Sequence, residues 1–125
     1  MWLGSRLTMG IRGGGAESPR SVHEHRLVVS DHKEGDSRTI RAVGELDIAT
    51  APLLEEWLRL AFEHHAGPIV LDLTEIGFVD RAGWRVLTSA AIRSRASGDR
   101  LRIRVGIGGV RRMIDATVVG ALPLA

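Results

Sequence analysis

The 125-residue chain contains no cysteine, which excludes disulfides, thiolate nucleophiles, iron–sulfur clusters and cysteine zinc sites. It also contains no tyrosine, and aromatic residues make up only 4% of it, so a platform for stacking on nucleic-acid bases is not predicted. No apolar run approaches the roughly 20 residues of a membrane span. The start MWLGSRLTMGIRGGG has no compact hydrophobic region, so no signal peptide is predicted either. We therefore expect a protein of the reducing cytoplasm.

Lysine is nearly absent as well, since Lys33 is the only one among 17 basic residues and the others are arginine. The acids almost balance these arginines, and the formal net charge is only +2, so the charge does not predict a nucleic-acid partner. Hydrophobic residues make up 44% and charged residues 26% of the chain, which is typical of a soluble globular domain. The length suits one domain with one core.

The composition changes near residue 21. Residues 1–21 include GIRGGGAESPRS, which is rich in glycine, serine and proline and shows no periodicity. This part is expected to be a disordered lead. Residues 22–125 carry regular patterns and are expected to form a single domain.

The first regular patterns begin at His25. Residues 25–30 and 38–46 are separated by a polar turn, which predicts two strands paired as a hairpin. Residues 47–67 contain the clearest helix, with Thr50 as a suitable N-cap. Its apolar stripe has the spacing i, i+3, i+4, i+7, i+8 and consists of Leu54, Trp57, Leu58, Ala61 and Phe62.

Strands and helices alternate in the second half. Residues 69–73 are almost wholly apolar, as expected of a central buried strand, and residues 74–82 are expected to form a connection. A second helix follows, and one of its faces consists of Gly83, Val86, Leu87, Ala90 and Ala91. Residues 100–105 alternate, so the arginines at positions 100, 102 and 104 are expected to face water.

The C-terminal part is predicted to hold a turn at residues 106–109, a short helix at 110–117 and a short strand or turn at 120–125. The resulting order β-β-α-β-α-β-α predicts an α/β fold. We expect a mixed sheet of about four to five strands with the helices mainly on one face.

Two short segments now carry a family resemblance. GELDIATAPLL (residues 44–54) and IVLDLTEIGFVDRAGWRVL (residues 69–87), followed by GDRLRIRV and VRRMID, resemble the STAS domain of bacterial anti-sigma factor antagonists. The resemblance covers about residues 25–125 and is carried by both segments occurring in this order at this spacing.

The resemblance implies a protein-binding regulator of transcription. In that family, a strand ends in an Asp-Ser-Ser-Gly or Asp-Ser-Thr-Gly turn at which a helix begins. A cognate anti-sigma factor, which is a serine kinase, phosphorylates the first serine and thereby releases the antagonist. The unphosphorylated antagonist captures the anti-sigma factor and frees the sigma factor, a mechanism known as partner switching.

The corresponding turn here is Asp80-Arg81-Ala82-Gly83, which keeps the aspartate and the glycine but has no hydroxyl. No phosphorylation is therefore expected at the family position, and the protein is expected to bind constitutively, to be regulated elsewhere or to be a degenerate copy. Arg81 has three interpretations: it contacts a partner carboxylate, it folds back onto Asp80 or Glu75, or it is tolerated drift.

The resemblance implies partner-binding residues that we expect at Asp47, Asp80, Arg81, Ala82, Gly83 and Trp84. Trp84 stands where the family usually has an aliphatic residue, and it either anchors an interface or packs under the first helix. Asp47 either contacts the partner or forms local hydrogen bonds before the helix. Val118 stands where the family usually has a glycine.

Other signals are weak. The five histidines do not form a convincing ligand set, so no metal or other cofactor is predicted, and no catalytic constellation is evident, so an enzyme is not predicted. The partner is expected to be an anti-sigma factor with a kinase-like domain, without nucleic acid or membrane insertion. The oligomeric state stays open, a homodimer included. The alternative function is a STAS-like accessory or scaffold subunit of a transporter ATPase or a stress-signalling complex.

Overall fold

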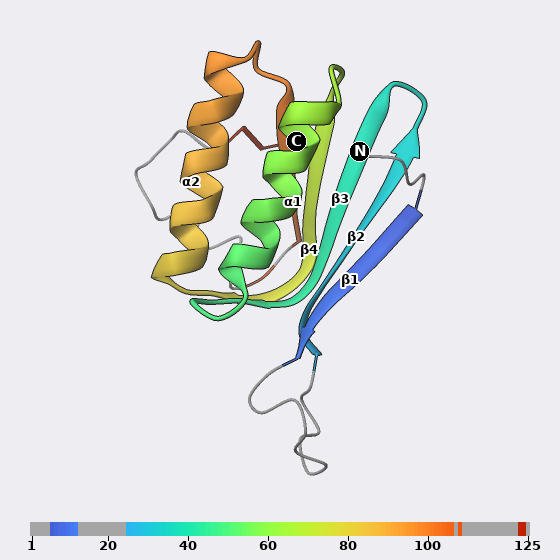
Figure 1. The fold of residues 1–125 in the computed structure, drawn as a ribbon. Coiled ribbons are helices and arrows are strands. Elements are labelled where there is room, and N and C mark those ends of the chain that lie inside the picture. Colours follow the sequence, from blue (N-terminus) through green and yellow to red (C-terminus); the bar gives the residue numbers. More distant parts are fainter. Residues whose placement is uncertain (1–5, 13–24, 107, 109–122, 125) are drawn as a thin grey trace.

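The computed structural model describes residues 6–12, 25–106, 108 and 123–124, which contain a five-stranded mixed sheet with both helices on one face (Figure 1). The elements in chain order are β1 (Arg6–Arg12), β2 (His25–Glu34), β3 (Ser37–Leu46), α1 (Ala51–His64), β4 (Ile69–Val79), α2 (Arg81–Ala96) and β5 (Leu101–Val105). The spatial order is β1-β2-β3-β4-β5, in which β1–β2 and β2–β3 are antiparallel and β3–β4 and β4–β5 are parallel. This arrangement confirms the predicted α/β fold and hairpin.

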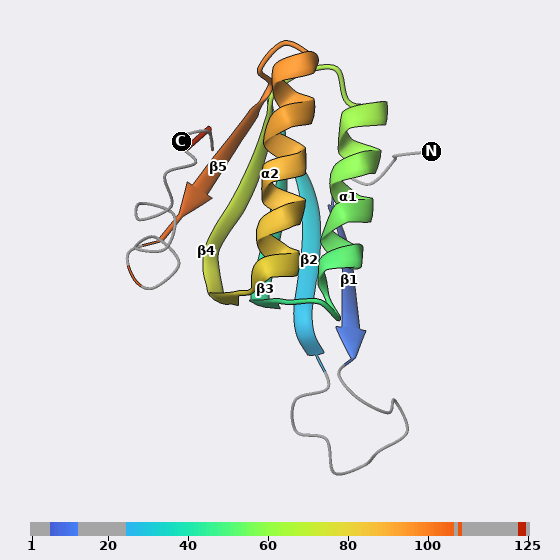
Figure 2. The same cartoon turned by 90° about the vertical axis from the view of Figure 1, so that its left-hand side faces the viewer.

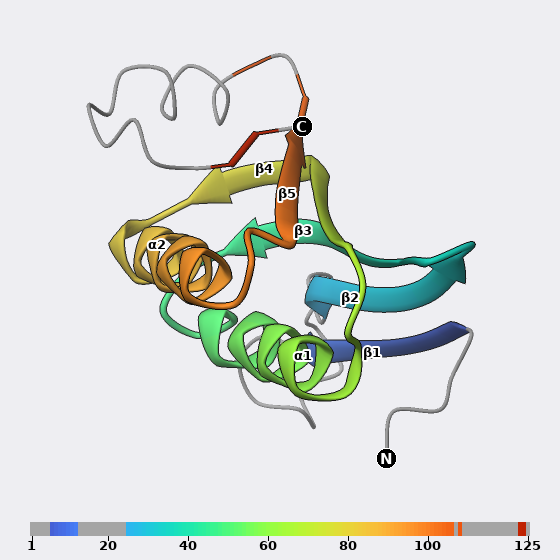
Figure 3. The same ribbon diagram turned by 90° about the horizontal axis from the view of Figure 1, so that it is seen from above.

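Both helices lie in crossovers between parallel strands, α1 between β3 and β4 and α2 between β4 and β5. Such crossovers share one hand, which places both helices on the same face of the sheet. Seen from above, α1 and α2 lie side by side against that face (Figure 3). Figure 2 shows both helices beginning at the same end of the sheet, because β3 and β4 run parallel and end there.

The core lies between the sheet and the two helices. The predicted apolar stripe of α1 is buried along its whole length, and so is the predicted face of α2. On the sheet side the core includes Leu27, Ile40, Leu71, Leu101 and Ile103, all of which are fully buried. Burial of aliphatic side chains of this size contributes about 1.5–3 kcal/mol each, so this layer supplies most of the stabilisation of the fold.

The expectation of a disordered lead is wrong for residues 6–12, which form β1 and pair with β2 from Arg6↔His32 to Arg12↔His25. The physical reason is that the segment RLTMGIR alternates apolar and polar residues, which suits a strand when a neighbouring edge is available. β2 provides such an edge, because its other side is already paired with β3. Residues 13–21 of the expected lead lie outside the described residues.

Residues 74–79 were expected in a connection but continue β4 as far as Val79. The register between β3 and β4 shifts at Arg41/Val43 and again at Gly44/Glu45. These irregularities break the alternation of buried and exposed side chains along β4. In its second half Ile76 and Val79 are buried, whereas the other residues, Thr74, Glu75, Gly77 and Phe78, are exposed. The second half of this strand therefore lacks the period of two by which strands are recognised.

Two expectations concern the C-terminal part. The helix predicted at residues 110–117 and the replacement at Val118 lie outside the described residues. At the chain end, the Ile103 N–H donates to the Pro123 carbonyl at 2.8 Å, and Ile103 forms a parallel bridge with Leu124. This bridge agrees with the strand or turn predicted there.

The arginine row on β5 is only partly as expected. Arg102 and Arg104 are exposed, and Arg104 lies 3.9 Å from Asp72. Arg100 instead turns toward the C-terminal end of α1, where its guanidinium donates to the carbonyls of Phe62, His65 and Gly67. These carbonyls have no acceptor role within the helix, so Arg100 caps α1 from a distant part of the chain.

A buried ion pair joins β2 to β3. Arg38 Nη1 lies 3.4 Å from Asp31 Oδ2, and both side chains are buried. Asp31 Oδ1 has no hydrogen-bond partner among the described residues. Burial raises the pKa of the Asp31 carboxyl to about 6, against the opposing effects of Arg38 and His32. The charged form of Asp31 is therefore disfavoured in the folded protein.

Candidate functional site

The candidate site lies at the end of the sheet where β3 and β4 stop. Leu46 and Val79 are paired at the last register position of these strands. Asp47 and Asp80 each follow directly, so the two segments that matched the family resemblance meet here. The parallel pairing of β3 and β4 explains why residues 33 positions apart in sequence belong to one site.

Asp80 joins the two segments. It is the N-cap of α2, and its Oδ1 accepts the Gly83 N–H at 2.9 Å. Its Oδ2 accepts the Ile48 N–H at 3.0 Å, and its own N–H donates to the Leu46 carbonyl at 3.0 Å. One carboxylate therefore caps α2 and fixes the loop after β3 beside it.

Gly83 is required by a close approach of two backbones. A Cβ at this position would lie 2.6 Å from the Leu46 carbonyl oxygen and 2.7 Å from Leu46 Cγ. Both distances are shorter than real carbon contacts allow. The aspartate and the glycine of the turn are thus explained by the packing of α2 against the end of β3, without reference to a phosphate.

Asp47 is buried, with an exposed fraction of 6%. Its Oδ1 accepts the N–H groups of Ala49 and Thr50 at 2.9 and 3.0 Å, and its other oxygen pairs with Arg26. Of the two interpretations of Asp47, local hydrogen bonding is the one seen, and the side chain offers little surface to a partner. Asp47 positions the loop.

Thr50 occupies the predicted N-cap position of α1 but makes no capping hydrogen bond with its side chain. Its hydroxyl instead donates to the Glu45 carbonyl at 2.8 Å and accepts the Asp47 N–H at 2.9 Å. The threonine therefore closes the loop between β3 and α1. The carboxylate of Asp47 takes over part of the capping, since it accepts the Thr50 N–H.

Arg81 is exposed on the first residue of α2. Among the described residues it has no ion pair, because Asp80 accepts backbone N–H groups and Glu75 pairs with Arg41. The interpretation in which Arg81 folds back onto Asp80 or Glu75 is therefore not the one seen. A cation in the first helical turn costs about 0.3–1 kcal/mol.

Arg85 adds a second cation four residues later on the same helix face, and it too is exposed. Like charges at this spacing cost roughly 0.2–0.5 kcal/mol. No acidic residue lies in the first turn of α2. Helix stability thus explains neither arginine.

Ala82 and Trp84 are half-buried and pack against the core cluster. For Trp84, this placement agrees with the interpretation as a packing residue, while the part that stays accessible leaves room for a contact. Of the six predicted site residues, the structure joins Asp80 and Gly83 by a hydrogen bond, while Asp47 bonds to its own loop and to Arg26. Of the six, Arg81 is the one that the structure leaves exposed.

Two exposed apolar residues at this end were missed from the sequence. Ile48 is 78% exposed and Phe78 is 51% exposed. Ile48 follows Asp47 in the loop, and Phe78 lies beside Glu45 near the end of β4. Their signal in the sequence was that neither belongs to an apolar stripe of a predicted helix or strand. The cores of protein–protein interfaces are more apolar and richer in aromatic residues than the rest of a protein surface.

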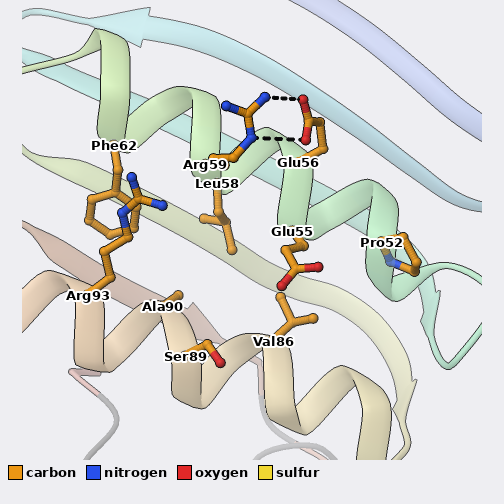
Figure 4. Close-up of a pocket in the computed structure, with 10 residues that line it drawn as sticks. All are labelled: Pro52, Glu55, Glu56, Leu58, Arg59, Phe62, Val86, Ser89, Ala90 and Arg93. Carbon is orange, nitrogen blue, oxygen red and sulfur yellow. Dashed lines mark hydrogen bonds and ion pairs between the residues drawn. The ribbon is translucent and has the colours of Figure 1, made fainter.

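A separate cavity of about 250 Å³ lies between α1 and α2, away from the turn (Figure 4). One wall carries Arg59, which binds Glu56 and Glu63. These hydrogen bonds raise the pKa of Arg59, and the bond from Arg59 lowers the pKa of Glu56. The Arg93 guanidinium lies 5.3 Å from the centre of the Phe62 ring. These four charged groups have partners within the fold.

The described residues hold no group of three or more histidine, aspartate or glutamate side chains placed to bind a metal ion. Of the two histidines at the end of α1, His65 has its Nε2 2.9 Å from the Asp36 carbonyl oxygen and 3.1 Å from that of Pro68. None of the helices within the described part of the chain has the length and apolar character needed to cross a bilayer.

Comparison with known proteins agrees with this architecture. The family profile described as "Mlab, STAS domain" matches residues 29–122. No curated protein sequence matches the chain. Sixteen solved chains match, and they include three anti-sigma factor antagonists.

The anti-sigma factor antagonist from Mycobacterium paratuberculosis is 19% identical, over 78% of this chain and 84% of that one, with a TM-score of 0.62. The antagonist SpoIIAA in its unphosphorylated form is 17% identical, over 69% and 79%, with a TM-score of 0.56. The antisigma-factor antagonist STAS domain from Rhodobacter sphaeroides is 19% identical, over 74% and 92%, with a TM-score of 0.52. At these identities the likeness establishes the fold alone.

Proposed function

The chain belongs to the STAS-domain family, and from this premise we propose that it is a non-enzymatic, cytoplasmic regulator of the anti-sigma factor antagonist type. In this role it captures an anti-sigma factor with a kinase-like domain and thereby frees a sigma factor. The proposed binding surface is the end of the sheet formed by residues 46–50 and 78–84. No cofactor takes part.

The observation that carries this proposal is the geometry of the turn Asp80–Gly83. Asp80 and Gly83 hold the start of α2 against Leu46, and this places Arg81 in solvent at the helix end. A cation held in a fixed place at the end of the sheet supports the proposal that this turn contacts a partner, although its hydroxyls are absent. The exposed side chains of Ile48 and Phe78 support the proposal, because they supply apolar contact area at the same end.

The chemistry of the turn sets the expected regulation. Neither Arg81 nor Ala82 has a hydroxyl to accept a phosphoryl group. Phosphorylation therefore does not release the partner at this position, and binding is constitutive unless it is regulated elsewhere. The side chain at position 81 is a permanent cation in place of a residue that would become an anion.

The test is affinity capture from an extract of the cells that produce the protein. The baits are the natural chain, Arg81→Ser and the matched control Arg81→Ala, each tested after phosphatase treatment and again with ATP. We expect all three baits to capture the same kinase-type protein and ATP to release only the serine variant. Capture of no protein with a kinase-like domain would refute the proposal.

The second candidate is an accessory or scaffold subunit of a transporter ATPase or a stress-signalling complex, which uses the same fold without a kinase. The same capture experiment separates the two. Recovery of a transport ATPase by all three baits, with no effect of ATP on the serine variant, would favour this candidate.

A further inference from the structure

The outer face of α2, defined here as Arg81, Arg85 and Ile92, points away from the sheet. These residues are spaced i, i+4 and i+11, so they share one side of the helix. All three are exposed, and Ile92 has an exposed fraction of 60%. The buried side of α2 faces the core, so the outer face has no role in the packing of the domain.

The arginines of α2 differ in how they are used within the fold. Arg93 lies 3.9 Å from Glu63 and over the ring of Phe62. Arg81 and Arg85, in contrast, have no side-chain partner among the described residues. Arg81 stands in the first turn, at the positive end of the helix dipole, where a cation is unfavourable, and Arg85 adds a like charge four residues later. Residues that lower the stability of their own helix without a compensating contact in the fold are expected at functional positions.

We propose that the outer face of α2 binds an acidic surface of a partner protein. Carboxylates of the partner pair with the guanidinium groups of Arg81 and Arg85, and an apolar side chain packs on Ile92. Arginine suits this role because its planar donors bind a carboxylate in bidentate fashion. The face is roughly 16 Å long, from eleven helical steps of 1.5 Å, which matches a short helix or strand of a partner.

This inference rests on the proposed function in one respect, namely that the partner docks at the start of α2. It adds the chemistry of the partner surface. A protein is favoured over an anionic membrane or a nucleic acid, because only Arg81 and Arg85 on this side of α2 lack a side-chain partner among the described residues, while the exposed Arg95 has one. Polybasic segments that bind lipid have about four to eight basic residues. The exposed isoleucine in the same row also favours a protein contact.

The experiment measures the affinity of charge-reversed variants for the captured partner. The protein that the natural chain captures is identified by mass spectrometry, purified and titrated against Arg85→Glu, Ile92→Ser and Lys33→Glu. Lys33→Glu is the matched control, because it makes the same change of charge on an exposed residue at the other end of the sheet. Urea unfolding of each variant accompanies the titration.

We expect Arg85→Glu to weaken binding by about tenfold or more, Ile92→Ser by several fold and Lys33→Glu by less than about twofold. Arg85→Glu places an acid four residues after Arg81, where opposite charges stabilise a helix, so the variant should be at least as stable as the natural chain. A loss of binding by this variant is then a lost contact and not a lost fold. Affinity should also fall as salt rises from about 50 to 200 mM. Replacing the facing partner acid by arginine should restore binding to Arg85→Glu.

The outcomes are distinguishable. If the partner is kinase-type and Arg85→Glu binds it as tightly as the natural chain, the acidic-surface inference is overturned and the proposed function stands. If the partner lacks a kinase-like domain but depends on Arg85, the proposed function falls and the inference stands. If the chain sediments with vesicles of phosphatidylcholine and phosphatidylglycerol and Arg85→Glu does not, a membrane replaces the acidic protein. Capture of no partner at either salt concentration overturns both.

Discussion

Replacing Gly83 by alanine should destabilise the protein, although alanine is the better helix former. The added Cβ would lie 2.6 Å from the Leu46 carbonyl oxygen and 2.7 Å from Leu46 Cγ. Leu46 is fully buried, and its carbonyl accepts the Asp80 N–H at 3.0 Å. The neighbour therefore cannot move away without disturbing the contact that joins β3 to α2.

The sign of the effect follows from comparing two terms. Alanine is favoured over glycine in a helix interior by about 0.8–1.0 kcal/mol. Overpacking a well-packed core costs about 1–3 kcal/mol, and weakening the hydrogen bond from Asp80 adds about 1 kcal/mol. The expected net loss is about 1–3 kcal/mol. Helix propensity alone would predict a small gain.

Urea unfolding followed by far-ultraviolet circular dichroism measures this difference. With a typical urea dependence, the loss corresponds to a fall of the midpoint by about 1 M. Gly77→Ala is the matched control, because a Cβ at Gly77 meets nothing within 4 Å. That variant should be neutral or slightly more stable. If Gly83→Ala is as stable as the natural chain, the packing explanation of Gly83 is wrong.

Three further predictions follow from other contacts. Asp80→Ala removes the acceptor of two N–H groups and should lower the free energy of unfolding in urea by about 1–2 kcal/mol. Asp80→Asn keeps one acceptor oxygen and should lose about half of that. Equal losses for the two variants would contradict the role of Asp80 in joining α2 to the loop after β3. Arg100→Lys keeps the charge but loses the planar donors to three carbonyls, so its unfolding free energy should fall by about 1–2 kcal/mol, and an unchanged thermal midpoint would argue against this cap. Burial raises the pKa of Asp31 to about 6 from 3.8, against Arg38 and His32, so the native state keeps a proton that the unfolded chain releases. The resulting stability is fully present below about pH 4 and is lost by about 2–3 kcal/mol as the pH rises through 6, and unfolding of Asp31→Asn over this range should lack the fall.

The two helices and strand β5 were predictable because the spacing of their apolar residues is a local pattern. The stripe of α1 and the face of α2 follow the helical period, and each is buried as that period predicts. The alternation in β5 likewise places Leu101 and Ile103 in the core. Each of these elements buries one face against the core, so the spacing of its apolar residues predicts which side chains are buried.

Strand β1, the second half of β4 and the contacts of Arg100 were not predicted, because each depends on residues distant in the sequence. β1 depends on pairing with the edge of β2, and the second half of β4 loses its alternation at the register shifts. Arg100 directly precedes the alternating strand β5, yet carbonyls at the end of α1, some 35 residues earlier, decide where its side chain lies. None of these partners is visible from the neighbouring sequence.

The candidate site was likewise predictable only in part. The motif brought the segments around Asp47 and Asp80 to attention, but only the parallel register shows why they meet. The exposure of Ile48 and Phe78 could not be predicted, because it depends on where β3 and β4 end.

The two kinds of residue in the turn Asp80–Gly83 therefore report on different things. Asp80 and Gly83 are required by the packing of α2 on β3, so they would persist whether or not the turn is phosphorylated. Their presence is evidence for the fold and does not indicate whether the turn is regulated by phosphorylation. Positions 81 and 82 are not required by this packing, since the Arg81 side chain has no hydrogen bond or ion pair within the described residues and Ala82 packs at the edge of the core. The regulation of this protein thus has to be inferred from Arg81 and Ala82 alone, and a permanent cation there predicts attraction to acidic groups where a phosphorylated serine would repel them.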